Sequence, residues 1–179
     1  MDKNRYSEWI NSSFGMQYIE MLLLSEVQGL GILDVELLEE LLQLKIGLQL
    51  PEDLSRIARY IVLSKLWIIG AYEIIRLVEK ITKNKDVFKE KINKIFREAL
   101  TLFTRIRVPL AKFEKRGKKE ILYSGIANSF IDPVKGVGWK IYEHHKKELK
   151  EEIFYRKDFG DIFLNMLNNI RYLCKIGKE

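Results

Sequence analysis

The sequence is poor in the residues from which small proteins build disulfides, metal sites and rigid turns. Its 179 residues include one cysteine, two histidines and three prolines. Because Cys174 has no second cysteine, an intramolecular disulfide is excluded, which fits a reducing compartment. One cysteine and two histidines cannot form a structural zinc site without several carboxylate ligands. We therefore predict no metal site and no cofactor.

Signals for export and for a membrane span are also missing. The N-terminal stretch MDKNRYSEW lacks the basic start and apolar core of a signal peptide. The most apolar run, residues 60–72, is shorter than the roughly 20 residues that a membrane span needs. We expect a cytoplasmic protein with no membrane association.

Sequence motifs of common enzyme classes are absent as well. The pair Gly136-x-Gly138 lacks the third glycine of a dinucleotide fingerprint, and no phosphate-binding loop, nucleophile elbow or zinc-protease motif occurs. In length and helix-rich layout the chain resembles the HEPN-type helical bundles, some of which cut RNA. Those bundles carry an arginine four to six residues before a histidine, whereas residues 138–141 before His144 and His145 include no arginine. The resemblance therefore implies no ribonuclease activity and assigns no site residue.

Charge is distributed unevenly along the chain, although the net charge is only +6. Residues 1–54 contain 3 basic and 10 acidic side chains, whereas residues 55–179 contain 28 basic and 15 acidic ones. One interpretation is that the acidic N-terminal segment packs beside the basic remainder. The other is that a basic face after residue 54 contacts an anionic partner such as nucleic acid.

The longest helical pattern covers about residues 51–83 and predicts the central helix of the fold. Pro51 suits its first turn, where a missing N–H does no harm. Between residues 60 and 72 the non-apolar positions are Ser64, Lys65 and Gly70. A helix that is apolar on nearly every side must be enclosed by other elements.

The whole pattern predicts a mainly α, single-domain bundle of five or six helices over residues 1–179, arranged around this central helix. Residues 1–11 are expected to form an irregular arm, and residues 118–142 a non-helical insertion, either a small β-hairpin or an ordered loop. Gly29 and Gly31 are expected to break the first helix, Asp34 to cap the second, and Pro109 to interrupt the chain after the fourth. The predicted helices cover about residues 12–28, 34–45, 51–83, 86–107, 142–152 and 158–176.

Two groups of charged residues are candidates for binding an anion or another ligand. Glu73 and Arg76 are three residues apart and share a helix face. They form either an ion pair at the edge of the core or a pocket in which Arg76 binds an anion. Arg105, Arg107 and Lys112 surround the predicted helix break, where free backbone N–H groups could bind an anion.

The predicted order of the helices also suggests a positive patch. If the fourth helix runs antiparallel to the central helix, its distal end returns beside the N-terminal half of that helix. Arg105 and Arg107 then lie nearer to Arg56 and Arg59 than to Arg76. These four arginines are therefore candidates for an anion-binding or nucleic-acid-binding surface.

No coherent catalytic set emerges, so the leading hypothesis is a non-enzymatic helical bundle that binds another protein or associates with itself. Aromatic residues expected near the surface support it, because aromatic side chains are enriched in interface cores. These residues are Tyr123, Phe130, Trp139, Tyr142, Phe154 and Tyr155. The alternative is a nucleic-acid-associated protein, with nuclease or regulatory activity, that uses the basic face after residue 54. A third hypothesis is a small-ligand or enzymatic pocket that contains Glu73, Arg76, Arg105 and Arg107.

Overall fold

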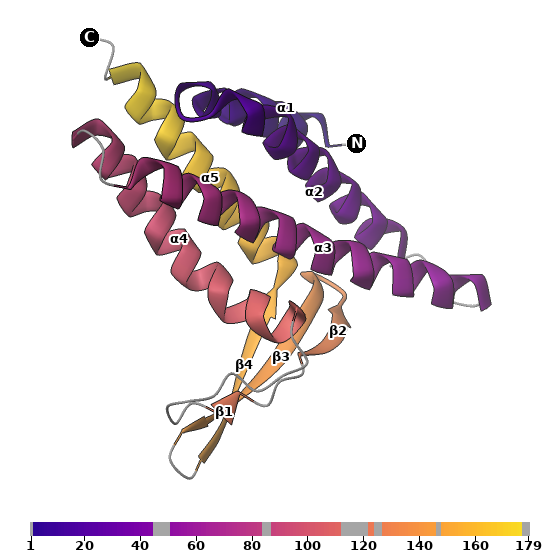
Figure 1. Ribbon diagram of the computed structural model, residues 1–179. Coiled ribbons are helices and arrows are strands. Elements are labelled where there is room, and N and C mark those ends of the chain that lie inside the picture. The colour runs from indigo at the N-terminus through magenta and orange to yellow at the C-terminus, as the bar shows by residue number, and fades with distance from the viewer. Residues whose placement is uncertain are drawn as a thin grey trace.

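The computed structural model describes residues 2–44, 51–83, 87–111, 122–123, 127–145 and 148–176. These ranges form a mostly helical molecule with a small antiparallel sheet at one end (Figure 1). In chain order the elements are α1 (Lys3–Ser13), the 3-10 helices η1 (Phe14–Tyr18) and η2 (Met21–Leu23), α2 (Leu24–Leu44), α3 (Pro51–Thr82), α4 (Val87–Ala111), β1 (Leu122–Tyr123), β2 (Asn128–Asp132), β3 (Gly136–His145), β4 (Glu148–Tyr155) and α5 (Arg156–Ile176).

Helix α3 is the long central helix that the sequence predicts, and it covers the predicted residues to within one position. Its buried face includes Trp67, whose ring contacts the rings of Trp9, Phe103 and Phe163 at centroid distances of 6.1–6.5 Å. These rings come from four different helices. The aromatic cluster therefore joins α1, α3, α4 and α5 into one core, because aromatic side chains bury large apolar areas.

The N-terminal region differs from the prediction. Residues 3–13 form α1 instead of an irregular arm, and Asp2 caps this helix by accepting hydrogen bonds from the backbone N–H groups of Asn4 and Arg5, both at 3.1 Å. Helix α2 also continues unbroken through both glycines. A Cβ atom at Gly31 would lie 2.8 Å from the Trp9 side chain, so this glycine lets α1 pack closely against α2.

A buried ionic cluster connects α1, α2 and α5. Asp34 lies in the middle of α2 with no exposed surface, and its carboxylate accepts hydrogen bonds from Arg5 (2.6 Å), Trp9 (2.9 Å) and Arg156. Arg156 is 2% exposed and lies 5.6 Å from the ring centre of Trp67. A carboxylate at this depth needs such partners because the loss of hydration is costly. The predicted capping role of Asp34 is therefore wrong.

Helix α4 continues past the proline that was expected to interrupt it. Pro109 lies inside the last turn and Ala111 ends the helix. The proline removes only the hydrogen bond to the carbonyl of Arg105, four residues earlier. Both Pro109 and Leu110 are buried, and their burial favours the continued helix.

The sheet is larger than the predicted hairpin. Strand β3 lies at its centre, with β4 along one side and with β2 and β1 in sequence along the other. The β2–β3 hairpin lies within the predicted non-helical insertion, and in its turn Asp132 accepts hydrogen bonds from the backbone N–H groups of Val134 (2.7 Å) and Lys135 (2.8 Å). The short helix predicted at residues 142–152 is wrong, because these residues belong to β3 and β4 where they are described. Figure 1 shows the β3–β4 hairpin extending away from the helices.

Candidate protein-binding surface on helices α2 and α3

The structure separates the four arginines that were expected to form one patch. Arg107 reaches Glu73, at 3.4 Å between Nη2 and Oε1, and its guanidinium lies 5.0 Å from the Tyr72 ring centre. Arg105 instead forms an ion pair with Glu152 on β4. Seventeen residues of helix, or about 25 Å, separate Arg56 from Glu73. The prediction of a common patch is therefore wrong.

Glu73 does gather two of the predicted cations. Arg76 pairs with Glu73 Oε2 at 2.7 Å, while Arg107 approaches Oε1. Both carboxylate oxygens thus have a partner, and Arg76 is 58% exposed. This arrangement is an ion pair at the edge of the α3–α4 contact, and exposed pairs of this kind contribute little to stability. Lys112, the remaining predicted residue, lies outside the described residues.

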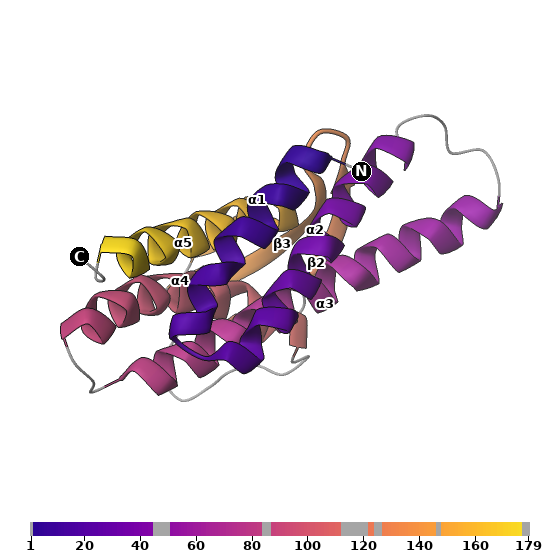
Figure 2. The ribbon, with the colours of Figure 1, turned by 90° about the horizontal axis from the view of Figure 1, so that it is seen from above.

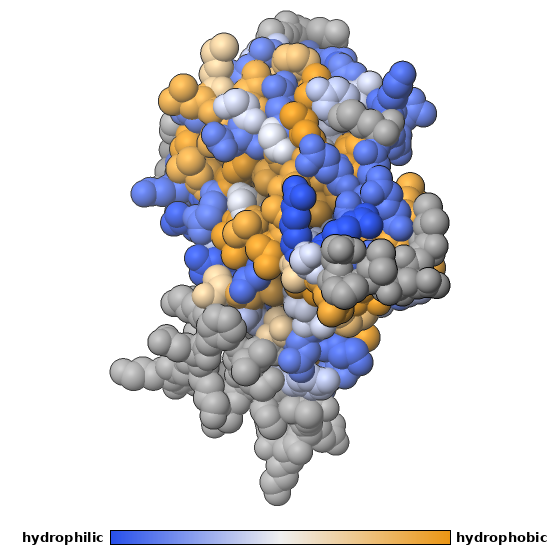
Figure 3. Space-filling view, turned by 90° about the vertical axis from the view of Figure 1, so that its right-hand side faces the viewer, coloured by the Kyte–Doolittle hydropathy of each residue, from blue (hydrophilic) through white to orange (hydrophobic). Residues whose placement is uncertain are grey.

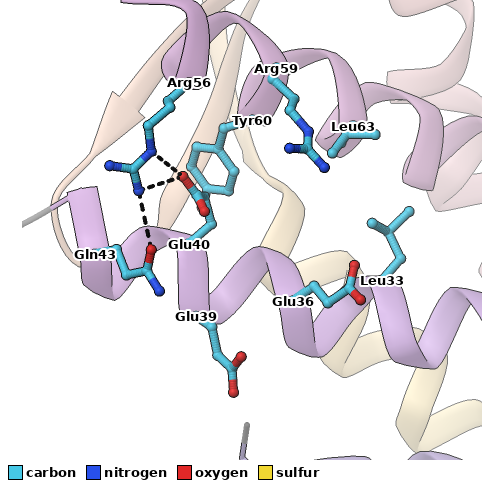
Figure 4. A pocket seen from close by; sticks show the side chains of 9 residues that line it. All are labelled: Leu33, Glu36, Glu39, Glu40, Gln43, Arg56, Arg59, Tyr60 and Leu63. Carbon is cyan, nitrogen blue, oxygen red and sulfur yellow. Dashed lines mark hydrogen bonds and ion pairs between the residues drawn. The ribbon is translucent and has the colours of Figure 1, made fainter. Parts of the chain in front are cut away.

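A groove lies between the C-terminal half of α2 and the N-terminal half of α3. Its volume is about 360 Å³, and Figure 4 shows its walls. The α2 wall contributes acidic and amide side chains, and the α3 wall contributes two arginines with Tyr60 between them. Apolar side chains continue the groove at one end. The lining residues are Leu33, Glu36, Glu39, Glu40, Gln43, Arg56, Arg59, Tyr60 and Leu63.

The charges in this groove are only partly matched. Arg56 donates from Nη2 to Glu40 at 2.9 Å and to Gln43 at 3.2 Å, so this arginine bridges the two walls. Glu36 and Arg59 come from opposite walls (Figure 4) and form no ion pair with any residue in the described ranges. The groove therefore holds one unmatched charge of each sign, both accessible to a ligand.

Tyr60 forms the base of the groove and connects it to the sheet. It is 2% exposed, and its hydroxyl oxygen accepts a hydrogen bond from the backbone N–H of Val137. Gly136, with a φ of +80°, packs against this hydroxyl, and a side chain there would clash with it. Burial raises the pKa of Tyr60 and outweighs the opposite effects of Arg156 and of the Val137 N–H. Tyr60 is therefore a neutral structural group near pH 7.

Beside the groove, α3 exposes an apolar ridge that the sequence was expected to bury. Leu54, Val62 and Leu66 are 71%, 53% and 54% exposed, and Ala58 is also exposed. These residues recur every four positions and so share one helix face. Figure 2 shows that the N-terminal part of α3 extends beyond α4 and α5. Within residues 60–72, for which enclosure was expected, Trp67, Ile68 and Ala71 are fully buried, whereas Val62 and Leu66 on the ridge are open.

The space-filling view shows the side of the molecule toward which the N-terminal end of α3 points. On this side hydrophobic residues lie among hydrophilic ones (Figure 3). Of the aromatic residues that were expected to reach the surface, five lie in the sheet and are buried or half-buried, namely Phe130, Trp139, Tyr142, Phe154 and Tyr155. Trp139 is fully buried, and the rings of Phe130 and Tyr155 pack against each other at 5.7 Å. An exposed apolar ridge is thus present on α3, whereas these aromatic side chains of the sheet are buried or half-buried.

Neither a metal site nor a membrane span is present in the described ranges. No group of three or more His, Cys, Asp or Glu side chains is placed to hold a metal ion there. No described helix combines the length and apolar character required to cross a membrane. Cys174 is buried, and its Sγ lies 3.8 Å from the carbonyl oxygen of Gly15, which fits a core residue.

Comparisons with protein-family models, with curated proteins and with solved structures give no match to this chain. The function must therefore be inferred from the geometry of the groove and the ridge.

Sequence reasoning identified Arg56 and Arg59 but missed the opposite wall and the ridge. Glu36 and Glu40 lie opposite the apolar stripe of the second predicted helix, a pattern that gives no reason to place them near an arginine. The ridge has a recognisable signal, because apolar residues every four positions from Leu54 to Leu66 follow a face separate from that of Tyr60 and Trp67. The sequence analysis instead interpreted these apolar residues as evidence that other elements enclose the central helix.

Proposed function

We propose that the chain is a non-enzymatic module that binds a protein partner, or a second copy of itself, through the ridge and groove of α2 and α3. One observation carries the proposal, namely the open ridge of Leu54, Ala58, Val62 and Leu66. Contiguous apolar residues rimmed by charged ones are typical of interaction sites. The rim here includes Arg59 on α3 and Glu36 on α2.

A photo-crosslinking experiment tests this proposal. The photoreactive residue benzoylphenylalanine replaces Val62 in one variant and Thr101, an exposed residue on α4, in the matched control. We expect a discrete crosslinked species from the Val62 variant that disappears when Leu66→Asp is added, and none from the control. Light scattering on the purified chain then shows whether the species contains a second copy. Absence of any adduct at Val62 in a folded variant would overturn the proposal.

Nucleic-acid binding is a second candidate, favoured by a cluster of lysines where α3 meets α4. Asn93 donates hydrogen bonds to the Glu79 carbonyl oxygen at 2.8 Å and to Thr82 Oγ1 at 3.0 Å, which brings the end of α3 beside the start of α4. Exposed lysines flank this contact on both helices. They are Lys80, Lys83, Lys91 and Lys94.

Binding to generic RNA and DNA across a salt series tests the second candidate. Contacts with phosphate must strengthen as salt falls, because binding releases condensed counterions. We expect replacement of the four lysines by glutamine to remove such binding. A lack of binding even at low salt excludes this function.

A further inference from the structure

The inference below rests on the proposed function and names the occupant of the surface. We infer that the ridge and groove bind a single amphipathic helix of another protein. Its apolar stripe covers the ridge, one of its flanks carries basic residues that meet Glu36 of α2, and its other flank carries acidic residues that meet Arg59 of α3. The shape of the surface and its charges support this occupant independently.

The shape of the surface fits a helix. From Leu54 to Leu66 the ridge covers thirteen residues of α3, whose ends are about 18 Å, or just over three turns, apart. Side chains spaced by four residues form the ridges that pack into the grooves of a second helix. Ala58 is the smallest side chain on the ridge and lies between Leu54 and Val62. A partner helix therefore approaches α3 most closely at this position.

The charges define the two flanks of the partner. Helix α2 contains no lysine or arginine, and three of its acidic residues, Glu36, Glu39 and Glu40, line the groove, so the wall that it contributes is acidic. Glu36 and Glu39 lie on this wall, with Glu39 pointing away from α3 (Figure 4). The opposite wall carries Arg59, while Arg56 is already bound to Glu40. A helix with opposite charges on its two flanks satisfies both walls at once.

A second copy of the chain does not fit these charges. In a twofold contact the same surface meets itself. The ridge of α3 has basic residues on both sides, with Lys65 on one side and Arg59 on the other. A symmetric α3–α3 contact would bring these cations toward their counterparts in the second copy, which is unfavourable.

Synthetic helices test this inference directly. Three peptides of about 18 residues, long enough to cover the ridge, are titrated against the full chain by fluorescence anisotropy. The first has a leucine stripe with lysines on one flank and glutamates on the other. The second keeps the stripe and has glutamates on both flanks, and the third keeps the charges of the first and replaces the leucines by serine. Circular dichroism establishes the helicity of each peptide.

We expect the first peptide to bind about fivefold or more tightly than the second, and the third not to bind. Glu36→Lys should weaken binding of the first peptide about threefold, whereas the same charge change at the exposed Glu98 on α4 should leave it unchanged. Leu66→Asp should weaken binding of the first peptide at least about tenfold. Leu102→Asp, at a partly exposed leucine of α4, is its control.

The outcomes distinguish this inference from the proposed function. If the first two peptides bind equally and Leu66→Asp abolishes the binding of both, the charged-helix inference is overturned. The proposed protein-binding function is then still supported. A dimer in light scattering that Leu66→Asp dissociates assigns the surface to a second copy and also overturns it. Failure of the first peptide to bind overturns the inference as well. Binding that survives Leu66→Asp contradicts both this inference and the docking surface.

Discussion

The Asp34 cluster and the α2–α3 groove both place arginines beside carboxylates, but in opposite environments. Asp34 is fully buried and is matched by Arg5 and Arg156, so each charge has a partner. In the groove Arg56 is 42% exposed, and Glu36 and Arg59 have no partner in the described ranges. Buried charges need a partner of opposite charge within the chain, whereas exposed charges are stabilised by water and remain accessible to a ligand. The comparison therefore separates charges that hold the fold together from charges that are available for binding.

The largest expected effect in this comparison comes from the removal of the buried carboxylate. Asp34→Ala leaves Arg156 and Arg5 without their shared anion and should cost about 3–5 kcal/mol of the free energy of unfolding. The control Glu36→Ala, two residues away on the exposed face of α2, should stay within about 0.5 kcal/mol. Urea unfolding of the two variants measures the difference. Equal losses would show that burial does not separate these sites.

The packing around the cluster gives a second contrast. A Cβ atom at Gly160 would lie 2.6 Å from Asp34 Oδ1, whereas a Cβ at Gly29 would meet no atom within 4 Å. Gly160→Ala should therefore destabilise the protein by about 1–3 kcal/mol. Gly29→Ala should stabilise it by about 0.5–1 kcal/mol, because alanine favours the helical state. Thermal and urea unfolding should give effects of opposite sign. Two stabilising substitutions would contradict the close packing at Asp34.

Tyr60 lies between the two environments, because it is buried at the base of the open groove. Tyr60→Phe removes the acceptor of the Val137 N–H and should cost about 1 kcal/mol at pH 7. Its raised pKa also gives a pH dependence. The neutral hydroxyl of Tyr60 therefore contributes to the free energy of unfolding. This contribution is complete below the unfolded-state pKa of about 10 and is lost as pH rises through the folded-state pKa. Above pH 10 the wild type should therefore lose stability more steeply than the phenylalanine variant. Parallel pH profiles would contradict this assignment.

The smallest effect is expected at the exposed ion pair of the groove. Arg56→Ala removes the contacts with Glu40 and Gln43 and should cost no more than about 1 kcal/mol, because solvent screens the pair. The loss should shrink at high salt. Chemical unfolding at low and high salt measures both values. If Arg56→Ala lowered the free energy of unfolding as much as Asp34→Ala does, independently of salt, this ion pair would have to be counted among the buried interactions of the core.

The strongly periodic parts of the fold were predictable from the sequence. The central helix and the last helix follow continuous helical patterns, and their limits agree with the prediction to within two residues. The β2–β3 turn is also predicted, because Asp132 and Gly136 are typical turn residues. In each case the signal is local. Helix periodicity and turn chemistry depend on neighbours in the chain and not on distant partners.

The errors arise where distant residues decide the local structure. Gly31 resembles a helix breaker in isolation, but it accommodates Trp9 from another helix. Residues 148–152, with the sequence ELKEE, can form part of a solvated helix or a strand with one polar face, and pairing with β3 selects the strand. Arg107 was placed too far from Glu73, because helix positions alone ignore how far an arginine side chain extends. The groove needs both helices in place and could not be found from either pattern alone.

The Asp34–Arg156 contact joins residues that are 122 positions apart. During synthesis at about 5–20 residues per second, Asp34 is made about 6 to 24 seconds before its arginine. During that interval only Arg5 and Trp9 can partner the carboxylate, and its Oδ1 still lacks the Arg156 contact that it has in the folded protein. Helices α1 and α2 therefore cannot complete their final packing until α5 has been made. Assembly of the core is thus a late event in the life of the nascent chain.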